Sequence, residues 1–306
     1  MTEPSVLRLS IIVTFALAIF GVVFGLLTGS ASIIFDGVYT LIDAIMTSFA
    51  LVVAKLIAFS HNDVGRARLT RNFTMGFWHL EPIVLGLSGT LLVGTAGYGL
   101  IMAVGSLMEG GRHLDFDLAL VFALVALVSA VGMIIYGRRA NKRLHSSFIA
   151  LDVKAWTISA AMTGALLLAF LTGWVIRGTE LEWLSPYIDP AVLALVCVIV
   201  LPLPLPTIRD ALADVLLVTP TEMKKRVDEV ASDAVQRHGF LSYRAYVARV
   251  GRGRQIEIYF IVPPGLPPRS LEAWDLIRDE IGEEVGGTGP DRWLTIAFTV
   301  NKEWAE

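Results

Sequence analysis

The sequence predicts an all-α transmembrane bundle of six helices followed by a smaller α+β domain. The first observation is composition: of 306 residues, 55% are hydrophobic and only 17% are charged, which is far from an average soluble protein. The second is a series of six apolar runs between residues 9 and 205. The third is an abrupt change after residue 218, since residues 219–306 carry 12 Lys/Arg and 14 Asp/Glu. We therefore expect a six-span domain at 1–218 and a second domain at 219–306.

The first three apolar runs occupy residues 9–27, 30–58 and 81–107. A helix needs ~20 predominantly apolar residues to cross a bilayer, so each run is long enough to span it. A cleaved signal peptide is the competing interpretation of the first run, but the apolar part of such a peptide is usually only ~7–15 residues long. The third run is rich in glycine, which allows neighbouring helices to approach closely.

The remaining runs occupy residues 118–136, 148–171 and 191–205. The last of them leads into a segment in which Pro202, Pro204 and Pro206 alternate with leucine. Each proline removes a helical hydrogen bond, so the sixth helix must be kinked, broken or finished at this point. A simple helix end and a functional hinge both fit the pattern.

The loops between the spans predict the orientation in the membrane. Seven basic residues lie in the loops after the second and fourth spans, and two lie in the loops after the third and fifth. Basic residues concentrate on the cytoplasmic side, so both termini should be cytoplasmic and the chain a multi-pass protein of the cell inner (cytoplasmic) membrane. The seven are Arg66, Arg68, Arg71, Arg138, Arg139, Lys142 and Arg143, and the two are Arg112 and Arg177.

The C-terminal segment has the pattern of an αββαβ domain. Residues 221–237 form the first helix, with Thr219 or Thr221 as its cap, and 241–250 and 255–262 alternate like two strands. The glycines at 251 and 253 predict a hairpin between these strands. Residues 270–284 form a second helix capped by Ser270, and 292–300 form a third strand. This order predicts an α+β sandwich of the ferredoxin-like type.

An acidic stripe on the second span is the strongest functional signal. At ~100° per residue, Asp36, Tyr39 and Asp43 fall within one ~60° sector of a helix. A carboxylate at bilayer depth costs ~2.5–3.5 kcal/mol on insertion scales, so it usually faces a partner or a wet pathway. The stripe therefore suggests a route for a cation. The single cysteine, Cys197, excludes a disulfide framework and a multi-thiolate metal site within one chain.

Three motifs resemble those of the cation diffusion facilitator (cation efflux) family. Residues 29–34, GSASII, followed by Asp36 and Asp43, are similar to the second-span motif, and residues 76–82, GFWHLEP, to the entry of the third span. Asp152 and the Gly-Ala pair at 164–165 match the fifth span. The resemblance covers nearly the whole chain. It implies a homodimeric exporter that exchanges a divalent metal for protons, with a metallochaperone-like cytoplasmic domain.

The resemblance also implies a metal site between spans two and five, and here the chain diverges. The four matching positions hold Tyr39, Asp43, Ala155 and Ser159, where the family usually has Asp or His. A site built from Asp43, Tyr39 and Ser159, with Asp36 and Asp152 as further candidates, contains only oxygen donors. Oxygen suits Mg²⁺, Mn²⁺ or Fe²⁺ better than Zn²⁺. No permanently bound cofactor is expected, and proton exchange would fall to the carboxylates.

Depth along the helices brings the two halves of this site together. At ~1.5 Å per residue, Asp43 lies ~12 Å above the inner boundary of a ~30 Å apolar core. Ala155 and Ser159 lie ~10 and ~16 Å above it, and Asp152 only ~6 Å. Each assignment has a structural alternative. Asp43 could make a hydrogen bond within the bundle, Asp36 and Tyr39 could serve helix packing, and Trp156 could fill the space of a missing ligand.

The histidines and the remaining function classes narrow the prediction further. The five histidines do not cluster, so we expect the C-terminal domain to dimerise without bound metal. A transport-inactive or regulatory family member is the rival interpretation, favoured by Ala155 and Ser159. An enzyme is disfavoured because we find no nucleophile–base set, phosphate-binding loop or metal-hydrolase spacing. Expected partners are a cation, protons, the lipid bilayer and a second copy of the chain, but no nucleic acid.

Overall fold

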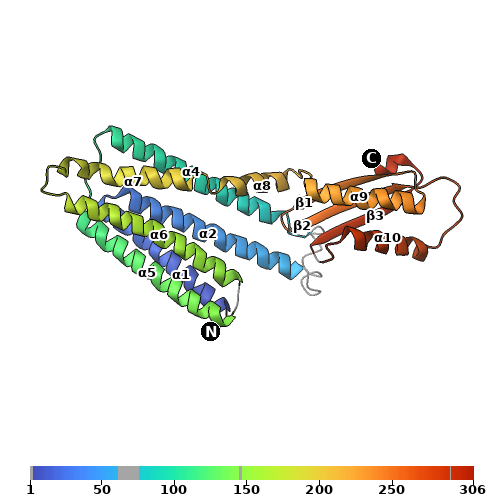
Figure 1. The fold of residues 1–306 in the computed structure, drawn as a ribbon, viewed down its shortest axis with the longest axis horizontal. Coiled ribbons are helices and arrows are strands. Elements are labelled where there is room, and N and C mark those ends of the chain that lie inside the picture. Colours follow the sequence, from blue (N-terminus) through green and yellow to red (C-terminus); the bar gives the residue numbers. More distant parts are fainter. Residues whose placement is uncertain (1–2, 61–75, 145–146, 290) are drawn as a thin grey trace. The chain divides into compact units, whose positions relative to one another are not determined.

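The structure is a computed structural model that describes residues 3–60, 76–144, 147–289 and 291–306 (Figure 1). Within these ranges, six helices are long and apolar enough to cross a membrane. They are followed by a small sheet with helices, so the predicted fold class is confirmed. Three of the basic loop residues and two of the five histidines lie outside the described ranges, namely Arg66, Arg68, Arg71, His61 and His145.

The first five predicted spans coincide with observed helices, and the sixth begins on one, although the bounds differ. The fourth helix runs well past the predicted end at Tyr136, because the basic residues that follow continue the helix as a polar last turn. Between the first two helices, Gly29 adopts φ +73°, a left-handed conformation that glycine tolerates and that reverses the chain. The helices are α1 Glu3–Thr28, α2 Ala31–Ser60, α4 Leu80–Met108, α5 Phe116–Leu144, α6 Ser147–Val175 and α7 Ser185–Val200.

The proline segment breaks the sixth span into two helices. α7 ends at Val200, turns occupy residues 201–204, and α8 (Leu205–Val215) begins at the next residue. Pro202 and Pro204 lie in this break, where their missing N–H groups cost no helical hydrogen bond. Of the three predicted outcomes, the structure therefore shows a broken helix.

Two compact units divide the chain, and each is described by itself. The first contains Met1–Phe49 and Leu87–Pro206, and the second contains Ala50–Gly86 and Thr207–Glu306. The second unit thus includes the adjoining ends of α2 and α4 as well as the C-terminal domain. The predicted domain boundary at 218/219 stays a prediction.

In the first unit, α5 packs along α6, and α1 contacts both (Figure 1). Small residues make these contacts close. A Cβ atom added to Gly137 of α5 would lie 2.5 Å from the Val153 side chain of α6, and one added to Gly37 of α2 would lie 2.6 Å from the backbone nitrogen of Val22 on α1. The backbones of α1 and α2 therefore touch at Gly37, which fixes how α2 is rotated against α1.

The second unit contains a three-stranded sheet of order β1-β2-β3. β1 (Ser242–Val250) and β2 (Gly253–Ile261) form the predicted antiparallel hairpin, with Val250 opposite Gly253. β3 (Arg292–Thr299) pairs with β2 in parallel, and α10 (Leu271–Val285) makes the crossover between them. With α9 (Thr221–His238) before the sheet, the element order is the predicted αββαβ.

Both helices of this domain bury apolar residues against one face of the sheet (Figure 1). β2 supplies Ile256, Ile258 and Phe260 to the core, the period-2 alternation expected of a sheet with one buried face. The cap of α10 is the predicted one, since the Ser270 hydroxyl accepts from the Ala273 N–H at 3.4 Å. The predicted threonine cap of α9 is wrong: Pro220 occupies the cap position without a side-chain hydrogen bond, and Thr221 is already helical.

The β1–β2 hairpin contacts helix ends of the same unit. The Arg252 guanidinium donates to Glu81, in the first turn of α4, at 2.9 and 3.3 Å. The Arg249 side chain donates to Asp214 of α8 at 2.7 Å. The Trp78 ring covers Gly253 so closely that an added Cβ would lie 2.5 Å from it. Two ion pairs and one close contact thus hold the hairpin against α4 and α8.

Candidate cation site

The direction of the acidic stripe follows from the residues that flank it on α2. Ile33 belongs to a buried cluster with Phe116 of α5 and with Leu166 and Phe170 of α6. At ~100° per residue, Asp43 lies ~80° around the helix from Ile33. The Ile33 side of the stripe therefore turns toward α5 and α6.

The other side of the stripe turns toward α4 and α7. Phe35 belongs to a second buried cluster, with Ala96 of α4 and with Leu193 and Cys197 of α7. Phe35 also lies ~80° from Asp43, in the opposite sense to Ile33. The stripe thus lies between the two sides of α2 that carry these clusters, and Asp43 itself is exposed.

Height along the helices pairs Asp43 with Ser159. Ile33 shares its cluster with Leu166 and Phe170, which sets a common level for α2 and α6. From that level, Asp43 is ten residues or ~15 Å along α2, and Ser159 is seven to eleven residues or ~11–17 Å back along α6. Asp43, Ser159 and the neighbouring Ala155 are all exposed in this chain. The packed contact at Ile33 therefore gives way to accessible polar groups at the level of Asp43.

Tyr39 and Asp36 lie closer to the packed level. The Tyr39 ring lies 5.5 Å from the Phe35 ring, centroid to centroid, and packs against the cluster of α4 and α7. Tyr39 precedes Asp43 by one helical turn, so its hydroxyl is on the same face. Asp36 is half-buried and only three residues, or ~5 Å, beyond Ile33. Tyr39 therefore combines packing with a place beside Asp43, whereas Asp36 lies about one turn before Tyr39 and about two turns before Asp43.

Asp152 makes a hydrogen bond of its own with α1. The Ser10 hydroxyl donates to the Asp152 carboxylate at 2.7 Å and accepts from the Trp156 indole N–H at 2.8 Å. Asp152 also lies ~21–27 Å from the level of Ile33, well beyond Asp43. The structure therefore does not bring Asp152 and Asp43 to one level.

The Trp156 side chain is buried beside Asp152, and its role as filler for a missing ligand stays a prediction. Its ring is only 6% exposed and packs with Val13 of α1 and with Ala130 and Met133 of α5. Large apolar surface and a single N–H donor suit a buried position with one polar partner, which Ser10 provides. Trp156 thus belongs to the contact between α1, α5 and α6.

Asp189, a buried carboxylate of the first unit, was missed by the sequence analysis. Asp189 of α7 is 1% exposed and accepts hydrogen bonds from the first turn of α2, including the Ser30 hydroxyl at 2.6 Å and the Ala31 N–H at 2.8 Å. An acid near the start of an apolar span, followed by proline, reads as a loop residue. The only signal in the sequence was the pair Ser30 and Ser32. Because a serine at the start of a helix can cap that helix by itself, the pair did not indicate a distant partner.

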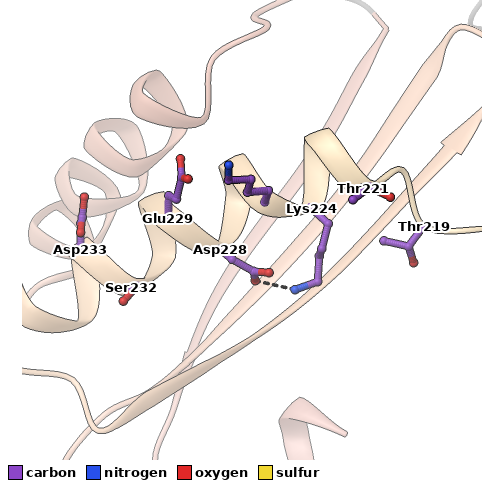
Figure 2. Close-up of a pocket in the computed structure, with 8 residues that line it drawn as sticks. Thr219, Thr221, Lys224, Asp228, Glu229, Ser232 and Asp233 are labelled. Atoms are coloured by element: carbon purple, nitrogen blue, oxygen red, sulfur yellow. Dashed lines mark hydrogen bonds and ion pairs between the residues drawn. The ribbon is translucent and has the colours of Figure 1, made fainter.

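A hollow on the surface of α9 offers no comparable site. Figure 2 shows it lined by Thr219, Lys224, Asp228, Glu229 and Asp233, among others. Lys224 pairs with the Asp228 carboxylate, which also accepts from the Tyr243 hydroxyl at 3.2 Å. Burial, and then the Asp228 charge, raise the pKa of Tyr243. Asp228 is therefore already neutralised by a lysine.

The donors available for a cation are oxygens. Across the described ranges, no three His, Cys, Asp or Glu side chains gather as a metal site would require. By helix geometry, the Tyr39 hydroxyl lies one turn before Asp43 on α2, and the Ser159 hydroxyl lies at the level of Asp43 on α6. One carboxylate and neutral oxygens can bind a hard divalent cation that keeps part of its water shell.

Comparison with known families identifies the larger part of the chain. Residues 7–216 match a family described as the cation efflux transmembrane domain. This range begins in α1 and ends just after α8, so it includes every helix that contributes to the stripe and its surroundings. No curated protein matches the chain.

Proposed function

Because the chain belongs to the cation efflux family, it is a multi-pass membrane transporter of cations, and we propose that it exchanges a divalent cation for protons at Asp43, between α2 and α6. The observation that carries this proposal is the shared level of Asp43 and Ser159, ~15 Å along their helices from the cluster at Ile33. Both residues are exposed, whereas Ile33 of α2 is buried in one cluster with Leu166 and Phe170 of α6.

The donor set favours a hard cation. Asp43 supplies the charge, and the hydroxyls of Tyr39 and Ser159 supply neutral oxygens. Without imidazole or thiolate, such a site suits Mg²⁺, Mn²⁺ or Fe²⁺ better than Zn²⁺. The cation is cargo, so the site must bind it weakly enough to release it.

The other two acids take separate roles in this proposal. Asp36, ~5 Å from the packed level at Ile33, lies on the path between Asp43 and the Ser30 end of α2. Asp152, held by Ser10 at 2.7 Å, lies toward the opposite end and attracts cations on their way to Asp43. Asp43 binds the cation in one orientation of the transporter and a proton in the other, which couples the two fluxes.

Orientation and assembly complete the proposal. Four exposed basic residues at the end of α5 favour a cytoplasmic location for that end and hence for both termini, in the inner membrane. The transporter works as a homodimer by alternating access, with α4, α7 and the C-terminal domain holding the two copies together. That domain dimerises without bound metal. The four basic residues are Arg138, Arg139, Lys142 and Arg143.

A transport-inactive or regulatory member is the second candidate. The observation that favours it is the pair Ala155 and Ser159, which face the level of Asp43 with one weak donor between them. Asp36 and Asp43 argue against this second candidate, because a bundle that transports no cation would be more stable with apolar residues at these positions.

Cation uptake into proteoliposomes tests the proposal. Uptake of Mn²⁺, Mg²⁺, Fe²⁺ and Zn²⁺ is measured for the wild type, Asp43→Asn and the control Ser48→Ala. Ser48 lies on α2 but its hydroxyl donates to its own helix, to Ala44 O at 2.8 Å. We expect uptake by the wild type and the control and its loss in Asp43→Asn. Uptake that survives Asp43→Asn contradicts the site, and a wild type without any uptake favours the regulatory member.

A further inference from the structure

The first turn of α2 has all of its free N–H groups satisfied. The Ala31 and Ser32 N–H groups donate to the Asp189 carboxylate of α7 at 2.8 and 3.3 Å. The Ile33 N–H donates to the Ser30 hydroxyl at 3.1 Å. Helix caps usually come from the residue before the helix, as Ser30 does here. The Ala31 and Ser32 N–H groups, however, are capped from another helix, because Asp189 lies 158 and 157 residues further along the chain.

The Asp189 carboxylate is enclosed by donors. Besides the two N–H groups, the Ser30 hydroxyl donates to it at 2.6 Å and the Ser32 hydroxyl donates to the same oxygen. All four partners donate, which matches the acceptor-only capacity of an ionised carboxylate. The positive end of the α2 dipole adds a further favourable interaction with a negative charge at this place. A side chain only 1% exposed is thus fully used in holding one helix end.

The same face of α7 also fixes how α2 is rotated. Asp189, Leu193 and Cys197 are spaced by four residues and therefore lie on one side of α7. Leu193 and Cys197 share the buried cluster of Phe35, one turn after the capped residues of α2. The hydrogen bonds to Asp189 set the height of α2 against α7, and the packing of Phe35 sets its rotation.

We propose that Asp189 is a positioning residue for the cation site. It holds the start of α2 on α7, so that the acidic face of α2 keeps its height and Asp43 stays at the level of Ser159 on α6. This inference rests on the proposed function for the identity of the site, but the cap itself does not. If the cap is lost, the first turn of α2 has two unsatisfied N–H groups in an apolar region and either frays or shifts.

Substitution of Asp189 by asparagine tests this role with little change of shape. The amide keeps one acceptor oxygen, but it turns an N–H donor toward groups that themselves donate. The matched control is Asp115→Asn. Asp115 is exposed and caps only its own helix, α5, by accepting from the Asp117 and Leu118 N–H groups at 3.1 and 3.3 Å. Both variants remove one carboxylate cap, but only one cap joins two helices.

Two measurements on the full chain in nanodiscs or proteoliposomes follow. Hydrogen exchange should become faster in Asp189→Asn at Ala31 and Ser32 and onward to Asp36 and Tyr39. The KM for the transported cation should rise by roughly three- to tenfold, the factor that corresponds to the ~0.7–1.4 kcal/mol of a helix cap. In Asp115→Asn, exchange should change only at the start of α5, with the KM unchanged. A loss of folded protein alone would lower the maximal rate and leave the KM as it was.

The outcomes separate the positioning role from the proposed function. Unchanged exchange in Asp189→Asn, or faster exchange confined to residues 31 and 32 with an unchanged KM, overturns the positioning role. If Asp189→Asn does not fold, Ser32→Ala removes one hydroxyl bond and keeps the carboxylate, and a smaller rise in KM is then expected. If the wild type moves no cation, the proposed function fails. Hydrogen exchange still decides whether Asp189 positions α2, because that role requires faster exchange as far along α2 as Tyr39.

Discussion

Replacing Gly37 by alanine should separate α1 from α2. The added Cβ would lie 2.6 Å from Val22 N, 2.8 Å from Ala18 O and 3.0 Å from Gly21 C. These are backbone atoms, which cannot rotate away as a side chain can, so the two helices must move apart. Overpacking of this kind costs ~1–3 kcal/mol.

The control for this prediction is Gly132→Ala on α5. Gly132 is exposed, and an added Cβ would meet nothing within 4 Å. Both variants gain helix propensity, up to ~1 kcal/mol for Gly→Ala in water, so the difference between them isolates the clash. We expect thermal unfolding of the purified protein in detergent to place Gly37→Ala below Gly132→Ala by ~1–3 kcal/mol in stability. Equal stability of the two variants would refute the close contact of α1 and α2.

Three further predictions concern other parts of the chain. Glu81→Gln removes the partner of Arg252, and because the two side chains are 25% and 40% exposed we expect a loss of ~1 kcal/mol or less, with faster proteolysis at the β1–β2 hairpin. Hydrogen bonds from Arg237 lower the pKa of Glu284, so this pair stabilises the fold above the unfolded pKa of ~4.3 and is lost as pH falls through the folded pKa. In Arg237→Gln, the melting temperature should therefore fall less steeply than in the wild type as the pH is lowered. The double variant Ala155→His, Ser159→Asp adds an imidazole and a carboxylate at the level of Asp43, and uptake assays should then show a shift toward Zn²⁺.

Each of these variants has a result that would contradict the prediction, and the first also has a control variant. For Glu81→Gln, the control is Arg244→Ala, whose pair with Glu306 is 4.0 Å long and mostly exposed; equal proteolysis in both variants would speak against the hairpin contact. For Arg237→Gln, an unchanged acid slope would show that the pair does not contribute. For the double variant, unchanged selectivity would mean that α6 does not face Asp43.

The sequence was sufficient for the helices and strands because local patterns determine them. Apolar length located all six spans, and the alternating prolines located the break after Val200. Period-2 alternation located the hairpin, and Ser270 was recognised as a cap because its partner is three residues away. The cap of α9 was misassigned because two threonines flank Pro220, and the sequence does not show which residue the helix starts from.

The candidate site was less predictable because its contacts are distant in sequence. The stripe on α2 and its level relative to Ser159 could be worked out from helix geometry alone. The bond between Asp189 and Ser30 joins residues 159 apart, and that between Ser10 and Asp152 joins residues 142 apart. Neither hydrogen bond produces a periodic pattern in the sequence. A single polar residue in an apolar run indicates that it has a partner but not which residue the partner is.

In the proposed mechanism, Asp43 couples cation movement to proton movement. The most direct test is to record both fluxes together in proteoliposomes, with a pH-sensitive dye inside and a panel of divalent cations outside, for wild type and Asp43→Ala. We predict that Mn²⁺ or another hard divalent cation drives proton movement in the opposite direction in the wild type, and that both fluxes disappear in Asp43→Ala. Cation-driven proton flux that persists in Asp43→Ala would rule out coupling at Asp43. A wild type that transports only Zn²⁺ tightly and selectively would rule out an oxygen-donor site for a hard cation.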